Sequence, residues 1–173
     1  NNGLWSVSWG ITGEENPLTW NAIGQNAALL NQWLHVAVTY DSASGERALV
    51  INGDTKAADS GVPPFEGSGE YPASIGKGPE PFIAYPTVEG RFQWARLSSM
   101  VRDVSTFGAT SNPTEADAWT ENLFLMKERN DGVVADSGFF WRHGILSGGE
   151  WVNLDGSPVV DADQDGYSVC EGD

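Results

Sequence analysis

The chain has 173 residues, of which 40% are hydrophobic and eight are Trp, enough to bury one sizeable core. Nine Lys and Arg against 24 Asp and Glu give a formal net charge of −15, which repels phosphate backbones and anionic lipid surfaces. This balance argues against nucleic-acid partners. No apolar run reaches the roughly 18 residues that a membrane-spanning helix needs. We expect one main domain followed by a short tail.

The first forty residues show the periodicity of strands. Leu4–Ile11 alternates, with Trp5, Val7 and Trp9 on one side, which is typical of a half-buried strand. A shorter strand is expected over Leu18–Ile23, and Trp33–Tyr40 is rich in β-branched and aromatic residues. These segments predict an antiparallel β-sheet protein.

A hairpin follows directly. Asp41–Gly45 has the composition of a turn, and Arg47–Ile51 has that of the returning strand. Asn52 and Gly53 then supply the positive φ angles that a second tight turn requires. Short strands separated by turns favour a sandwich or barrel over alternating strands and helices.

The rest of the chain is less regular. The Gly- and Pro-dense stretch from Gly61 to Pro86 would support only short strands such as Ala73–Gly76, and the next long strand is expected over Arg91–Val101. One helix is expected near 113–130, because Trp119, Leu123 and Met126 recur at helical spacing. A closing hairpin could combine two further segments, Phe139–Trp141 and Glu150–Leu154.

Two stretches carry a resemblance to a known family. Leu30–Asp41, followed by Gly45 and by Leu49–Gly53, resembles the central hairpin of laminin-G-like domains of the concanavalin-A-like superfamily. Gly90–Ser98 resembles a later strand of the same domains, with Gln93 where an Asp is usual. The resemblance covers roughly residues 3 to 110 and implies a two-sheet jelly roll.

The predicted fold is therefore an all-β, two-sheet antiparallel β-sandwich with one short helix in its C-terminal half. We expect a laminin-G-like sandwich with the packed helix over 1–132, a closing hairpin or linker over 133–160, and an Asp-rich tail over 161–173.

The tail resembles the Asp-rich calcium repeats of secreted bacterial proteins. Calcium needs six to eight oxygen ligands, and carboxylates at every second position let a short loop wrap around it. The resemblance implies calcium as a cofactor and a later partner for Cys170. A solvated acidic tail is the alternative. The expected metal ligands are Asp161, Asp163, Asp165, Tyr167 through its carbonyl, and Glu171 or Asp173 in place of the usual twelfth-position Glu.

Catalytic motifs are not evident in the sequence. No run of paired carboxylates suits a glycoside hydrolase, and His35 and His143 are distant from each other in sequence. We therefore expect a protein that is not an enzyme.

The leading hypothesis is a secreted or cell-surface binding or adhesion module that recognises a glycan or an extracellular protein surface. Trp20, Trp94 and Trp141 are the aromatic residues that strand alternation explains least, and a flat aromatic ring can stack on a sugar. Packing in the core or an interface is the alternative role of each.

Two other functions stay open. The family's usual first strands are not visible before Asn1, and an open sheet edge would invite self-association, so the chain could be a structural subunit of a calcium-bridged extracellular assembly. The third hypothesis, a polysaccharide-active enzyme, rests on fold analogy alone.

Overall fold

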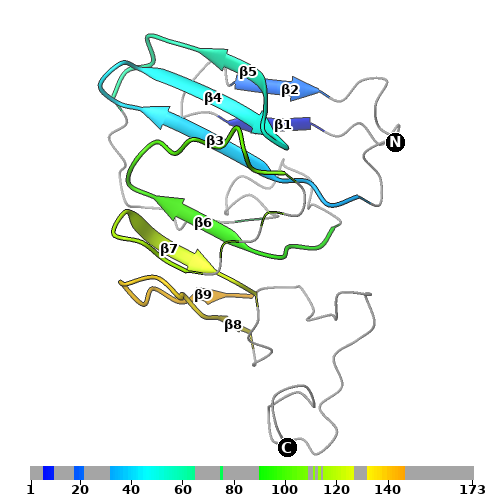
Figure 1. The fold of residues 1–173 in the computed structure, drawn as a ribbon, viewed down its shortest axis with the longest axis vertical. Helices are drawn as coiled ribbons and strands as arrows, with labels where there is room; N and C mark the ends of the chain where they lie inside the picture. The colour runs from blue at the N-terminus through cyan, green and yellow to red at the C-terminus, as the bar shows by residue number, and fades with distance from the viewer. Residues whose placement is uncertain are drawn as a thin grey trace, which may run out of the picture. The chain divides into compact units, whose positions relative to one another are not determined.

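All regular structure in the described residues is antiparallel β-strand (Figure 1). The computed structural model describes residues 6–9, 18–21, 32–64, 75, 90–108, 111, 113, 115–126 and 132–146, with the backbone alone for the first two ranges. The all-β prediction is confirmed. The strands are β1 Ser6–Trp9, β2 Leu18–Asn21, β3 Val36–Asp41, β4 Glu46–Ile51, β5 Asp54–Asp59, β6 Ala95–Ser98, β7 Thr120–Phe124, β8 Val133–Val134 and β9 Gly144–Ile145.

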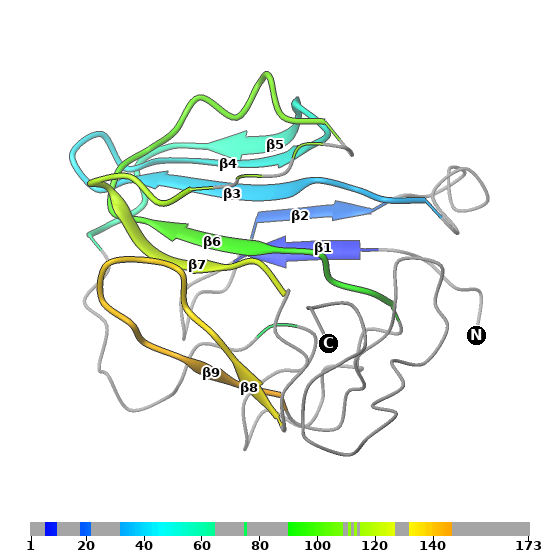
Figure 2. The ribbon, with the colours of Figure 1, turned by 60° about the horizontal axis from the view of Figure 1, so that its bottom comes forward.

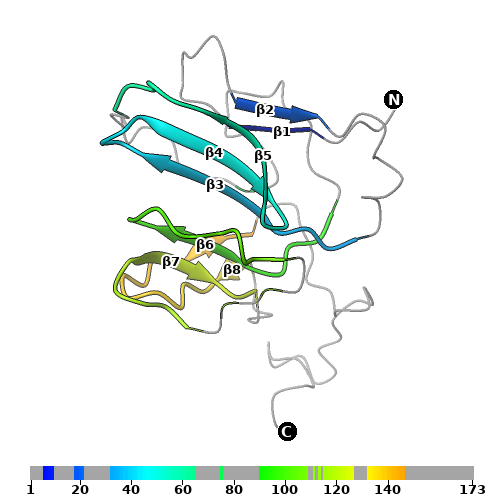
Figure 3. The same cartoon turned by 45° about the horizontal axis from the view of Figure 1, so that its top comes forward.

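The chain divides into two compact units, described separately below. The first unit comprises Asn1–Glu89 and Met100–Ser111, and the second comprises Gly90–Ser99 and Asn112–Asp173. In the first unit, the two-stranded sheet β1-β2 and the three-stranded sheet β3-β4-β5 form two layers, because β2 lies against β4 and β5 (Figure 3). This is the face-to-face packing of a β-sandwich.

The core of the first unit is centred on β4. Leu49 is fully buried, and Val50 and Ile51 are nearly so, which means that both faces of this central strand are covered. Leu49 pairs with Val38 of β3 and with Ala57 of β5. The run of apolar residues in the sequence thus becomes the middle strand of its sheet.

The turn between β4 and β5 is the predicted Asn52-Gly53 turn. Both residues have positive φ, 51° and 86°, as a tight two-residue hairpin requires. Asn52 also bonds back to β3: its Oδ1 accepts a hydrogen bond of 2.8 Å from the amide of His35, and its own amide donates to the His35 carbonyl at 2.9 Å. One residue therefore both forms the turn and fixes the start of β3.

Gly53→Ala is expected to destabilise the first unit by at least about 2 kcal/mol. A side chain at positive φ costs about 1–2 kcal/mol, and the added Cβ would also overlap the carbonyl oxygen of Ser105. Gly61→Ala is the matched control, because Gly61 has φ +77° with open space around it and should show the backbone penalty alone. Equal losses in chemical denaturation would contradict the close approach.

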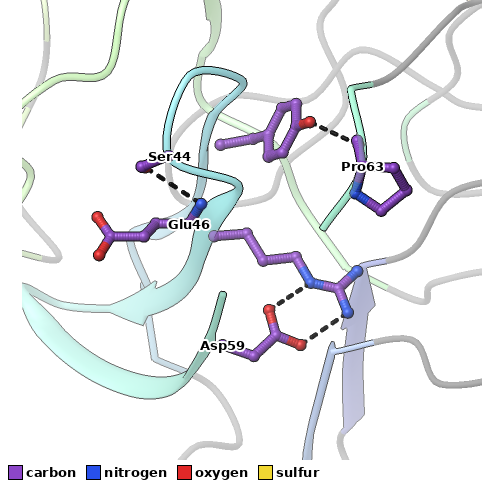
Figure 4. A network of polar contacts seen from close by, with 6 residues as sticks. Ser44, Glu46, Asp59 and Pro63 are labelled. Carbon is purple, nitrogen blue, oxygen red and sulfur yellow. Dashed lines mark hydrogen bonds and ion pairs between the residues drawn. The ribbon is translucent and has the colours of Figure 1, made fainter. Parts of the chain in front are cut away.

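An ion pair between a buried Arg and an exposed Asp joins β4 to β5. The Arg47 side chain is 2% exposed, and its Nε and Nη2 donate to the two carboxylate oxygens of Asp59 at 2.7 and 2.8 Å (Figure 4). These hydrogen bonds, aided by the charge of Arg47, hold the pKa of Asp59 below its ordinary value of 3.8 against the opposing effect of burial. Nearby, the Tyr40 hydroxyl donates to the Pro63 carbonyl at 2.7 Å. These contacts organise the end of the sheet.

The second unit contains two short antiparallel pairs. β6 pairs with β7, and β8 pairs with β9. A bridge between Phe124 and Asp136 continues β7 toward the segment that follows β8. Leu123 is fully buried and Val134 nearly so, and they form the apolar centre of the described part of this unit.

The helix predicted near 113–130 is wrong where its residues are described. Thr120–Phe124 form β7, which pairs with β6. Just before it, the carboxylate of Asp117 accepts hydrogen bonds from the amide of Trp119 and the hydroxyl of Thr120. This local turn competes with helix formation, and strand pairing prevails over helical spacing. Of the expected apolar stripe only Leu123 is buried, since Trp119 is 56% exposed.

Other predicted boundaries also changed. The strand expected over Arg91–Val101 is limited to the four residues of β6. Phe139–Trp141 was expected in a strand but lies in the connection between β8 and β9. The hairpin here is formed by these two short strands, one before and one after the aromatic residues. Glu150–Leu154 lies outside the described residues, as does Ala73–Gly76 apart from Ile75.

Candidate functional site

The loop that joins β8 to β9 displays three consecutive aromatic side chains to solvent. Phe139 is 64% exposed, Phe140 is 53% exposed and Trp141 is 74% exposed. Figure 2 shows this loop extending from the β8-β9 pair. Single exposed apolar residues are common on protein surfaces, but contiguous ones mark interaction sites. We call residues 135–143 the aromatic loop.

A buried carboxylate holds the base of this loop. Oδ1 of Asp136 accepts hydrogen bonds from the amides of Leu123 and Gly138, each at 2.8 Å. Oδ2 accepts from the side-chain amide of Asn122 at 2.8 Å and from the backbone amide of Arg142 at 2.9 Å. The carboxylate thus joins β7 to both ends of the aromatic run.

These hydrogen bonds also determine the ionisation of Asp136. Burial by itself would raise its pKa, but the backbone amides of Leu123, Gly138 and Arg142, with the side chain of Asn122, outweigh burial and lower the pKa below 3.8. Asp136 is therefore negatively charged at neutral pH and acts as an acceptor for four donors.

Two further hydrogen bonds close the loop. The amide of Asp136 donates to Nδ1 of His143 at 3.0 Å, so the two ends of the loop are joined directly. The amide of Ser137 donates to the carbonyl of Leu123 at 2.7 Å. The aromatic side chains are thus exposed on a segment whose backbone has many fixed contacts.

The backbone at Trp141 has an unusual conformation. Its φ is 54°, a left-handed value that a bulky side chain rarely adopts. Such strain persists only where surrounding contacts impose it, and here the next amide, that of Arg142, is bonded to Asp136. Trp141 thus combines a strained backbone with a side chain that is 74% exposed.

Arg142 lies beside the exposed rings. Its guanidinium carbon is 4.6 Å from the centre of the Phe140 ring, a cation–π distance. Its Nη1 is 3.6 Å from Oε2 of Glu121, a partly exposed ion pair on β7. The aromatic surface therefore has a polar margin that contains both a donor and an acceptor.

The strands that carry the loop are themselves apolar on one face. Val133 and Ile145 are cross-strand partners and are 45% and 87% exposed. Since paired residues in antiparallel strands share a face, these two side chains lie together. They make a second exposed apolar feature of the same hairpin.

The three predicted ligand-binding tryptophans have different outcomes. Trp20 lies in β2 of the first unit, where only the backbone is described. Trp94 is half-buried just before β6. Trp141 is the most exposed tryptophan of the described residues and belongs to the aromatic loop. Phe139, Phe140 and Asp136 were not predicted as site residues; the aromatic run was visible in the sequence but was interpreted as a strand.

The predicted calcium ligands, Asp161, Asp163, Asp165, Tyr167, Glu171 and Asp173, lie outside the described residues, and calcium binding there stays a prediction. Within the described ranges, no group of three or more His, Cys, Asp or Glu is placed to hold a metal ion. In the same part of the chain, no helix is long and apolar enough to cross a membrane.

Both histidines have structural contacts. His35 is buried and stacks on Phe107, with ring centres 5.0 Å apart, and burial lowers its pKa below 6.5. Nδ1 of His143 accepts the Asp136 amide, as described above.

Antiparallel sheets packed in two layers define the first unit as a β-sandwich. A laminin G family model, described as the concanavalin A-like lectin/glucanases superfamily, matches residues 1–102. This match covers more than half of the chain, so the chain belongs to that superfamily. No curated protein and no solved structure matches it. The aromatic loop lies beyond the matched residues.

Proposed function

We propose that this chain is a non-catalytic binding module that recognises a glycan through the aromatic loop. The observation that carries the proposal is the exposure of Phe139, Phe140 and Trp141 on a loop whose backbone is held by Asp136. Aromatic rings present a flat apolar face, and the Trp side chain retains an N–H donor at its edge. Preorganisation of the loop reduces the entropy lost on binding.

The name of the superfamily includes both lectins and glucanases, so membership is compatible with glycan binding and with glycan hydrolysis. The local chemistry favours binding. Glycoside hydrolysis needs two carboxyl groups that can reach the glycosidic bond. At the aromatic loop, the oxygens of Asp136 are engaged by four protein donors, and Glu121 pairs with Arg142. These engagements support a recognition role.

We further propose that the module acts in a secreted or cell-surface protein and that its Asp-rich segment binds calcium. The resemblance of residues 161–173 to calcium repeats of secreted proteins supports both points.

The direct test is capture of the purified chain on a panel of immobilised polysaccharides and glycoproteins, once with calcium and once with chelator. We expect capture of at least one glycan class. Loss of capture with chelator would indicate that the Asp-rich segment contributes to the site. No capture in either condition would contradict glycan recognition, and calcium-dependent self-association in that case would favour the assembly-subunit hypothesis.

A further inference from the structure

We propose that the aromatic loop selects neutral glycans with equatorial linkages and discriminates against acidic polysaccharides. This inference rests on the proposed function and specifies its ligand class. It follows from three observations: the ion pair between Arg142 and Glu121, the negative net charge of the chain, and the chemistry of the exposed aromatic rings.

The first step concerns Arg142, the guanidinium of the aromatic loop. An acidic sugar needs a cation to pair with its carboxylate or sulfate. Arg142 is already placed 3.6 Å from the Glu121 carboxylate and 4.6 Å from the Phe140 ring centre. An acidic ligand would have to displace Glu121 and would then lie beside that displaced carboxylate. The local electrostatics therefore oppose an anion.

The second step concerns the whole chain. Its formal net charge is −15, so a polyanion experiences repulsion as it approaches at low ionic strength. Screening over about 8 Å at physiological salt weakens this effect without removing the local one at Glu121. Neutral chains experience neither repulsion.

The third step concerns the shape of the ligand. A pyranose whose hydroxyl groups and linkages are equatorial exposes flat faces of C–H groups, which suit the electron-rich face of an aromatic ring. Trp141 and Phe139 supply such rings, and the paired Glu121 and Arg142 supply an acceptor and donors for the equatorial hydroxyls at the ring edges. A chain with equatorial linkages is extended, so it can present a flat face of C–H groups on each of several successive sugars.

The experiment compares two derivatives of one backbone, hydroxyethyl cellulose and carboxymethyl cellulose, which differ in charge. Affinity electrophoresis at low salt is expected to show at least about tenfold tighter binding of the neutral polymer, with the ratio falling as salt is raised. Dextran, a neutral polymer with axial linkages, is expected to bind weakly. Equal or tighter binding of carboxymethyl cellulose, or equal binding of dextran, would overturn the inference.

Glu121→Gln tests the local step, because it removes the carboxylate beside Arg142 and keeps the side-chain size. It is expected to raise the affinity for carboxymethyl cellulose severalfold relative to the affinity for hydroxyethyl cellulose, because the Gln side-chain oxygen still offers an acceptor to the neutral polymer. Glu46→Gln is the matched control. Glu46 is an exposed residue of β4 in the first unit, so this substitution removes the same charge at a site away from the aromatic loop. An equal gain in both variants would overturn the role of Glu121.

Failure of this inference and failure of the proposed function give different results. Capture of acidic polysaccharides alone, lost on Trp141→Ala, would retain glycan recognition by the loop and overturn the neutral preference. Binding to no polysaccharide of any charge would overturn both.

Discussion

Trp141→Gly is expected to reduce glycan affinity by at least about tenfold without lowering the thermal unfolding temperature. The indole is 74% exposed, so its removal takes little from the folded state. Glycine also adopts the φ of 54° without the penalty that a bulky side chain incurs. A central aromatic contact is commonly worth 2 kcal/mol or more in a complex, which is about thirtyfold in affinity.

Trp119→Ala is the matched control for this substitution. Trp119 is also exposed and also belongs to the second unit, but it precedes β7 and lies outside the aromatic loop. Isothermal titration with a captured oligosaccharide should show unchanged affinity for Trp119→Ala. If Trp141→Gly binds as tightly as the parent chain, the loop does not contact the glycan.

Asp136→Ala should produce the largest loss of stability, at least about 3 kcal/mol, because each buried donor left without an acceptor costs about 1–3 kcal/mol. The affected donors are the amides of Leu123, Gly138 and Arg142 and the side chain of Asn122. Urea unfolding measures the change. Asp103→Asn is the control: Asp103 is an exposed carboxylate bonded to Ser105, and its replacement should leave the unfolding midpoint nearly unchanged.

Gly138→Ala is a second test of whether the Asp136 carboxylate holds the aromatic loop. Its Cβ would lie 2.8 Å from Oδ1 of Asp136, so the carboxylate must shift while its charge is retained. We expect a smaller loss of stability than for Asp136→Ala and weaker glycan binding. Normal stability in both variants would show that Asp136 does not hold the loop.

The lowered pKa of Asp136 also gives its contribution a pH dependence. A carboxylate whose folded-state pKa is lowered contributes stability that is complete above its unfolded value, near 3.8, and is lost as pH falls through the lower folded value. The stability difference between the parent chain and Asp136→Ala should therefore narrow in acid. A difference that is constant from neutral pH to below the folded-state pKa would contradict ionisation of this residue in the folded state.

The hairpins of the first unit could be predicted because their signals are local. β3 is rich in β-branched residues, β4 ends in the apolar run Leu49–Ile51, and a turn lies between them. Asn52-Gly53 has few alternatives to a tight turn. The segment around Leu123 was wrongly predicted as a helix, because the spacing of apolar residues does not distinguish a helix from a strand whose partner is distant in sequence. β6, which pairs with it, lies more than twenty residues earlier in the chain.

The candidate site was predicted only in part. Trp141 was identified because strand alternation did not explain it, and it proves to be exposed. Asp136 could not be identified, because three of its four donors are backbone amides, which every non-proline residue carries. Only the folded chain brings Asn122, Gly138 and Arg142 to the same carboxylate.

The most direct test of glycan recognition by the aromatic loop is an NMR titration of the intact chain with a captured neutral oligosaccharide. The Trp141 indole N–H signal is assigned by its absence in Trp141→Phe. The account predicts that this signal and the amides of residues 136–145 shift together with a single affinity. Saturable shifts confined to the first unit, with the Trp141 signal unmoved, would contradict it.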